Sequence, residues 1–301
     1  MDGLETVRQL CKIDARVPII MFSTLTEHGA SATLEALSLG ATDYVTKPSN
    51  VDMTSTIDAI SRELIPKIRA LCHLPRRSEK HCSGVRTKIP CACHPASSTT
   101  IVLPAASGGD WCLDRWSGRA GAASAVFAGE LSVARVIAHH MPPIFTSLLA
   151  ARLTAKSSLP VRECVSGEPL MPGCVVIAPG DFHLVVSRGD GIVLLRTHQG
   201  VKENFCRPSV DVLFHSIASI FGARALAVVL TGMGQDGLRG CEALRAAGAR
   251  AFVQDEASNV VWGMQGFVAR NGLADKILPL DQIGAEIVQA TALQVAARTQ
   301  S

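Results

Sequence analysis

The chain has 301 residues, which is enough for two domains that each bury a hydrophobic core. Hydrophobic residues make up 48% and charged residues 18%, a balance typical of a folded globular protein rather than a disordered one. The net charge of +3 and the lack of a long basic block argue against a nucleic-acid partner. No apolar run approaches the roughly 20 residues of a membrane-spanning helix, and the first residues lack signal-peptide features. We therefore expect a cytoplasmic protein without membrane insertion.

Short strands and helices are expected to alternate in the first part of the chain. Residues 17–22 form a continuous apolar run typical of a buried strand, and residues 43–45 predict a second strand. Residues 30–39 carry apolar side chains at helical spacing and stop at Gly40, a residue favoured just after a helix C-terminus. A longer amphipathic helix is predicted at residues 53–71.

The second part of the chain returns to the same alternation. Apolar runs predict strands at residues 136–138, 174–177, 184–186, 192–195, 225–230 and 251–253. Helical patterns lie between several of them, at residues 210–221 and 238–247. Strands that alternate with helices favour an α/β fold, with a parallel or mixed sheet that is covered on both faces.

Two polar residues follow predicted strands directly. His140 comes after the strand at 136–138, and Asp236 lies in the glycine-rich segment 231–237 after the strand at 225–230. Ligands of open parallel sheets bind outside the carboxyl ends of the strands, so these residues are candidates for the base and the orienting acid of a serine hydrolase. On spacing alone, a structural histidine and an aspartate in an ordinary turn stay open alternatives.

Longer motifs around these residues carry a resemblance. The motifs are His-Met-Pro-Pro at 140–143, Arg-Pro-Ser-Val-Asp-Val-Leu-Phe at 207–214, Thr-Gly-Met-Gly-x-Asp-Gly at 231–237 and Gln-Asp-Glu-Ala-Ser at 254–258. In this order they resemble the chemotaxis protein-glutamate methylesterase (CheB) family. The resemblance implies a doubly wound, mostly parallel α/β methylesterase domain at residues 136–290. It also implies that His140 is the general base, that Asp236 orients it, that Met233 lies near the oxyanion, and that no cofactor or metal is needed.

The family's reactions follow from the same resemblance. It implies hydrolysis of glutamate methyl esters on methyl-accepting chemotaxis receptors, and deamidation of receptor glutamines at the same site. Both are acyl transfers through a tetrahedral oxyanion, which a nucleophile, a histidine base and backbone donors can catalyse. The implied partners are the receptors as substrates and a chemotaxis histidine kinase.

The first 72 residues resemble another unit of the same family, the C-terminal half of a flavodoxin-like response-regulator receiver domain. The matching segments are residues 1–5, 21–26 and 43–49, in which Ser23 and Lys47 occupy the family's hydroxyl and phosphate-contacting lysine positions. The phospho-accepting aspartate and the acidic metal pocket of the receiver have no match in the residues given. We therefore expect Ser23 and Lys47 to be ordinary strand-end residues.

The family's nucleophile motif, Gly-Ala-Ser-Thr-Gly-Gly, is missing. The most similar segment is Ala-Ser-Gly-Gly at 106–109, which lacks the residue that separates the serine from the glycine pair in the family motif. Read one base later, the codons of Trp111 and Trp116 become glycine codons at the required spacing, and the motif's serine falls at Leu113. We therefore interpret residues 73–135 as a linker plus a frameshifted stretch that begins between about residues 76 and 107 and ends near Arg135. A genuine linker with a variant loop is the alternative.

Two further alternatives concern function. Without the serine motif, the chain could be a catalytically dead relic or a receptor-binding protein that does not turn substrate over. The second alternative is a zinc site, suggested by two histidines and three cysteines at His81, Cys82, Cys91, Cys93 and His94. Their Cys-x-Cys spacing is not the usual Cys-x2-Cys of zinc sites, so we expect no metal there.

Overall fold

The computed structural model describes residues 2–14, 17–24, 26–47, 53–72, 100–105, 133–259 and 261–299. Several residues that the sequence singled out lie outside these ranges. They are Ser107, Leu113, the tryptophans Trp111 and Trp116, and the histidine and cysteine set between His81 and His94. The frameshift hypothesis and the alternative of a genuine linker therefore both stay predictions.

The N-terminal unit contains three helices and two parallel strands. They are α1 (Gly3–Ile13), β1 (Ile20–Thr24), α2 (Glu27–Leu39), β2 (Asp43–Lys47) and α3 (Met53–Leu71). Gly40 follows α2 in the left-handed conformation, with φ of 118°, and its N–H donates to carbonyls of the last helical turn. This capping explains why α2 ends where the sequence predicted. The predicted strand at 17–22 forms three residues later than expected, as β1.

A seven-stranded sheet forms the centre of the second unit, and all of its strands run parallel. Its order is β11-β10-β9-β3-β4-β6-β5. The strands are β3 (Thr100–Ala105), β4 (Ala134–His139), β5 (Val161–Glu163), β6 (Val175–Ile177), β9 (Ala225–Val229), β10 (Arg250–Gln254) and β11 (Lys276–Leu278). The predicted α/β class with a parallel sheet is therefore confirmed.

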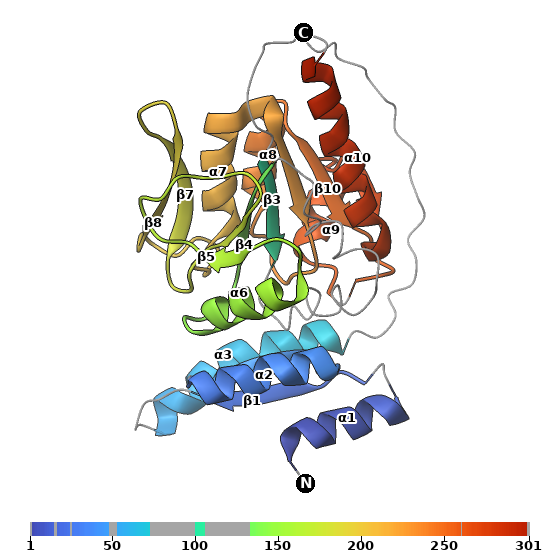
Figure 1. The fold of residues 1–301 in the computed structure, drawn as a ribbon. Helices are drawn as coiled ribbons and strands as arrows, with labels where there is room; N and C mark the ends of the chain where they lie inside the picture. The colour runs from blue at the N-terminus through green and yellow to red at the C-terminus, as the bar shows by residue number, and fades with distance from the viewer. Residues whose placement is uncertain are drawn as a thin grey trace.

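Helices cover both faces of this sheet (Figure 1). Helices α7 (Val210–Phe221), α8 (Leu238–Ala246) and α9 (Met264–Arg270) pack on one face, against alternate side chains such as Ala227 of β9. Helices α6 (Phe145–Lys156) and α10 (Leu280–Thr299) pack on the other, against the intervening side chains such as Val228. A short 3₁₀ turn, Gly222–Arg224, joins α7 to β9. The sheet is thus doubly wound, as the sequence predicted.

Strand β3 comes from the segment that the sequence assigned to a linker and a frameshifted stretch. It lies in the middle of the sheet, paired with β4 along its whole length and with β9 over residues 100–102. Its register places Ala105 opposite His139, so β3 ends beside the strand that leads into His140. The sheet therefore draws on residues as early as 100, although the sequence predicted no strand between residues 72 and 136.

Two predicted strands take no part in the parallel sheet. β7 (His183–Arg188) and β8 (Val193–His198) instead form a separate antiparallel hairpin. The hairpin packs on α7, where the Ser216 hydroxyl accepts a hydrogen bond from the Val186 amide at 3.0 Å. The turn between the strands contains Gly191 with φ of 77°, a conformation that glycine adopts without strain.

The N-terminal unit packs against the second unit through α6, and α2 and α3 lie beneath this helix in Figure 1. Tyr44 of β2 stacks on Phe145 of α6 with ring centroids 4.9 Å apart and nearly parallel planes. Both side chains belong to one hydrophobic cluster that also includes Leu37 of α2 and Leu149 of α6. The two units therefore share a core.

Candidate functional site

His140 is placed by the end of a buried strand. β4 ends at His139, and His140 follows at the carboxyl edge of the sheet, ahead of the Met141-Pro142-Pro143 turn. Only 4% of its side chain is exposed. This is the edge at which parallel sheets bind their ligands, as the sequence predicted.

Asp236 reaches the same edge from a second strand. It lies between the end of β9 and the start of α8, in a loop where Gly234 and Gly237 have φ of 89° and 92°. These left-handed residues let the chain reverse tightly and turn the carboxylate inward. The loop is braced by the motif at 254–258, since the Gln254 side chain accepts a hydrogen bond from the Thr231 backbone N–H at 3.1 Å.

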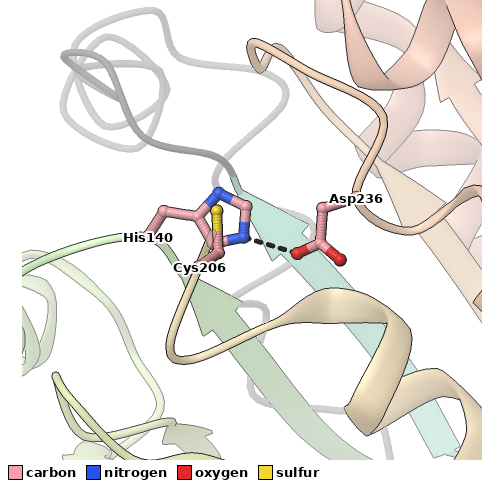
Figure 2. A group of neighbouring side chains, drawn as sticks. All are labelled: His140, Cys206 and Asp236. Carbon is pink, nitrogen blue, oxygen red and sulfur yellow. Dashed lines mark hydrogen bonds and ion pairs between the residues drawn. The ribbon is translucent and has the colours of Figure 1, made fainter. Parts of the chain in front are cut away.

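The structure brings the two predicted site residues together, 96 positions apart in sequence. His140 Nε2 lies 2.7 Å from Asp236 Oδ2, and only 2% of the Asp236 side chain is exposed (Figure 2). An ionised carboxylate can only accept, so Nε2 carries the hydrogen and donates it. The other ring nitrogen, Nδ1, is buried and has no hydrogen-bond partner among the described residues. It is therefore the nitrogen that is left to exchange a proton with a reacting group.

Four further donors hold the Asp236 carboxylate. Oδ1 accepts from the Ser209 hydroxyl at 2.8 Å, the Asn204 amide at 3.1 Å and the Asp211 backbone N–H at 3.2 Å. Oδ2 accepts from the Val210 backbone N–H at 2.7 Å in addition to His140. The two backbone donors lie at the N-terminus of α7, where the helix dipole favours a negative charge. The carboxylate is therefore fixed in position and in its ionised form.

The pKa values of the pair move in opposite directions. Burial alone would lower the pKa of His140, but its bond to Asp236 and the nearby Cys206 thiol outweigh burial and raise this pKa to about 10. Burial alone would raise the pKa of Asp236, but its bond to His140 and its other donors lower this pKa to about 2. Asp236 therefore stabilises the protonated imidazole, which is the role of the orienting acid in a hydrolase triad.

A third side chain at the site was missed by sequence reasoning. The Cys206 sulfur, a ring nitrogen of His140 and a carboxylate oxygen of Asp236 all lie within 4.8 Å of one another (Figure 2). Cys206 directly precedes the Arg-Pro-Ser motif at 207–209. Its position next to this motif could have indicated that Cys206 lies near the site. The chain has ten cysteines, however, and nothing else in the sequence distinguishes Cys206 from the others.

Nitrogen, sulfur and oxygen donors of this kind are found in zinc sites. The Asp236 carboxylate, however, already accepts five hydrogen bonds, and a cation would have to displace some of these donors. The donor network fits a proton-transfer site better, and we assign no metal to it.

The strand that would lead to a serine nucleophile is present, although the serine region is not described. β3 ends at Ala105, two positions before Ser107 and eight before Leu113. Met233, implied to lie near the oxyanion, is half-buried in the Asp236 loop, and its role stays a prediction.

Comparisons with known proteins identify the family of the chain. The model of the CheB methylesterase family matches residues 124–287, more than half of the chain. The chain belongs to the CheB methylesterase family. The resemblance that the sequence motifs predicted is therefore confirmed. The match begins inside the segment 73–135, and the proposed division into 1–72, 73–135 and 136–290 stays a prediction.

Relatives cover nearly all of the chain. A protein-glutamate methylesterase/protein-glutamine glutaminase of Trichodesmium erythraeum is 41% identical over 96% of this chain and 82% of its own length. One of Nocardioides sp. is 43% identical over 98% of this chain and 80% of its own length. The crystal structure of the Thermotoga maritima CheB methylesterase catalytic domain matches with a TM-score of 0.59 and 33% identity, over 65% of this chain and 100% of that chain. These CheB relatives carry the names of hydrolases, and the solved one shares the fold.

Proposed function

We propose that this CheB chain hydrolyses glutamate methyl esters on chemotaxis receptors and deamidates receptor glutamines, with His140 as the proton-transfer base and Asp236 as its orienting acid. The observation that carries this proposal is the buried 2.7 Å contact between His140 Nε2 and Asp236 Oδ2 at the carboxyl edge of the sheet. Receptors as substrates and a chemotaxis histidine kinase as partner follow from the family. No described helix is long and apolar enough to cross a bilayer.

In this mechanism His140 takes a proton from the nucleophile and later gives it to the leaving group. The leaving group is methanol for the ester and ammonia for the glutamine amide. Asp236 stabilises the positive ring between the two transfers, and its five donors hold it in place. The same residues can therefore serve both reactions, since both pass through a tetrahedral intermediate.

Methanol release from methylated receptor membranes tests the proposal. The purified chain should release methanol, and His140→Gln should reduce the rate by about 10³-fold or more. His215→Gln is the matched control, since His215 lies exposed on α7 and outside the site. Ammonia release from receptors that carry unmodified glutamines should respond to the same variants. Lack of release by the parent chain, or release that His140→Gln leaves intact, would contradict the proposal.

A further inference from the structure

Asn204 lies in a tight loop whose backbone is closed on itself. The Cys206 N–H donates to the Glu203 carbonyl at 2.8 Å, and the Glu203 N–H donates to the Cys206 carbonyl at 3.2 Å. Between them, Asn204 and Phe205 adopt left-handed conformations with φ of 51° and 64°. Asparagine is one of the few non-glycine residues that enter this region readily, so the loop can carry a polar side chain at its bend.

Ion pairs anchor the loop on both sides of this bend. Before it, Glu203 pairs with Arg239 of α8 at 3.4 Å. After it, the Arg207 guanidinium pairs with Asp181 at 2.7 Å and donates to the Gly200 carbonyl at 2.9 Å. The backbone that carries the Asn204 side chain is therefore held from two directions.

The Asn204 amide lies between two buried carboxylates. Its nitrogen donates to Asp211 Oδ2 at 2.9 Å and to Asp236 Oδ1 at 3.1 Å, and both acids are buried. An ionised carboxylate only accepts, and an amide nitrogen carries two hydrogens, so each hydrogen serves one acid. Like charges this close repel each other, and a shared donor between them offsets the repulsion.

Asp211 connects this amide to the helices that frame the site. Its other oxygen, Oδ1, accepts from the Gly240 N–H at 2.7 Å in the first turn of α8, the helix that begins two residues after Asp236. Burial raises the pKa of Asp211, and the nearby charge of Asp236 adds to this effect. The Asn204 amide thus joins the start of α7, the start of α8 and the carboxylate of the site.

We propose that Asn204 is a positioning residue of the hydrolysis, whose amide bridges the two buried carboxylates and keeps Asp236 Oδ2 turned toward His140. This inference rests on the proposed function, since it concerns how the same pair is held. Asn204 acts through Asp236. Its donation occupies Oδ1 and leaves Oδ2 to accept from His140 Nε2 and from the Val210 N–H.

Two substitutions separate the amide from the shape of the loop. Asn204→Asp keeps the size and the tolerance for left-handed backbone, but places a third carboxylate where the donor was. Asn204→Gly keeps the backbone conformation without strain and removes the side chain. Each should lower methanol release by about 10- to 100-fold, as expected for loss of hydrogen bonds to charged acceptors. Asn271→Asp makes the same change at an exposed asparagine after α9, and this matched control should equal the parent.

The pH dependence distinguishes the bridging role from simple support of the loop. A carboxyl between Asp211 and Asp236 has a raised pKa, because burial and two like charges disfavour its ionised form. When protonated it carries a hydrogen again and can donate to one of the two acids. The rate of Asn204→Asp relative to the parent should therefore rise by about tenfold from about pH 9 to about pH 6. The relative rate of Asn204→Gly should stay constant over this range.

Other titratable groups near the loop do not produce this difference, because the parent and both variants contain all of them. They are His140, His183, Cys206, the Glu203–Arg239 pair and the Arg207–Asp181 pair. Their titration therefore cancels in the relative rates. Parent rates in both Asn204 variants would overturn the inference. Equal losses in the two variants at every pH would also overturn it, since the side chain would then only support the loop.

A measurement without turnover separates this inference from the proposed function. The Nε2–H of His140, buried in its bond to Asp236, should give a downfield proton resonance in NMR spectra that His140→Gln removes. Asn204→Asp should displace this resonance at about pH 9 and return it toward the parent position at about pH 6, and Asn204→Gly should displace it at both. This pattern without methanol release by the parent would support the positioning role and contradict the proposed function. Methanol release by the parent with an unchanged resonance in both variants would leave the proposed function standing and overturn the positioning role. Neither methanol release nor a displaced resonance would overturn both.

Discussion

The two units of the molecule place polar residues at the ends of parallel strands in the same way, yet among the described residues only those of the second unit meet in a site. In the N-terminal unit, Ser23 lies near the end of β1, and Lys47 ends β2. The Ser23 hydroxyl donates to the Gly29 carbonyl at 3.0 Å and accepts from Thr33, both within the next helix, and Lys47 is exposed. In the second unit, His140 and Asp236 meet from strands 96 positions apart and are nearly excluded from solvent.

The difference shows that a strand-end position does not by itself make a functional residue. The contacts of Ser23 are local and would form in any strand followed by this helix. Those of Asp236 converge from β4, the loop at 203–206 and the start of α7. Long-range convergence on one buried charge distinguishes the site. Among the described residues no such convergence forms around Ser23 or Lys47, and their assignment as ordinary strand-end residues stays a prediction.

The largest expected effect on turnover comes from removing the negative charge of Asp236. Asp236→Asn keeps the shape of the side chain but cannot stabilise the protonated ring of His140, so methanol release should fall by about 10⁴-fold. Circular dichroism should show a folded protein, since three of the five donors retain an oxygen acceptor when the amide oxygen takes the place of Oδ1. A loss of less than about tenfold would mean that Asp236 is not the orienting acid.

The shared core offers the next test. Phe145 is fully buried against Tyr44, and Phe145→Ala should lower the free energy of unfolding by about 3–5 kcal/mol. Phe205→Ala is the matched control, because Phe205 is 97% exposed and should change stability by less than about 0.5 kcal/mol. Urea denaturation measures both, and equal effects would contradict the contact between the two units.

The lowered pKa of Asp236 predicts an acid-dependent loss of stability. Its folded pKa of about 2 lies below the ordinary 3.8, so its contribution is complete above 3.8 and disappears as the pH falls through about 2. We expect this group to remove about 2 kcal/mol from the free energy of unfolding across that window. Urea titrations at a series of pH values measure it, with Asp236→Asn as the comparison. Equal acid dependence in both proteins would contradict the shift.

A smaller effect on turnover is expected from the removal of one hydrogen-bond donor to Asp236. Ser209→Ala removes the 2.8 Å hydrogen bond to Asp236 and leaves the other four donors in place. Loss of one bond to a charged acceptor is worth about 1.5–3 kcal/mol, so methanol release should fall by roughly 10- to 100-fold. Ser216→Ala, which removes a hydroxyl on the hairpin side of α7, is the control and should leave turnover unchanged. Equal rates for both variants would mean that Ser209 does not position the carboxylate.

The smallest effects belong to the N-terminal strand ends. Ser23→Ala should lower the free energy of unfolding by about 1 kcal/mol, and Lys47→Ala by less than about 0.5 kcal/mol. Neither substitution should change methanol release. A fall in turnover without a fall in stability would show that these residues take part in function after all.

Strong periodic segments were predictable from sequence, and the site only in part. The helix at residues 210–221 was predicted at its observed bounds, because its apolar spacing and its flanking residues agree. β3 was not predicted, because Thr100–Ala105 is short, contains Pro104 and lies among residues of unusual composition. Only pairing with β4 and β9 makes it a strand, and this pairing is invisible in a local pattern.

For the site, the strand-end rule and the family motifs led to His140 and Asp236, and the structure places these two residues in contact. Cys206 lies in a loop whose conformation depends on Asn204 reaching Asp236, a contact across 32 positions. No spacing rule anticipates such a loop. The same reasoning explains the hairpin of β7 and β8, which looked like two more strands of the main sheet, since alternation alone does not tell one sheet from another.

The crowding of donors around Asp236 also bears on reorganisation energy. In water, moving a proton onto an imidazole requires solvent dipoles to turn toward the new charge, and that reorientation is part of the barrier. Here five N–H and O–H dipoles already point at the carboxylate before any substrate arrives. The reorientation was completed when the chain folded, so the field that stabilises the charged ring is present from the start of each turnover.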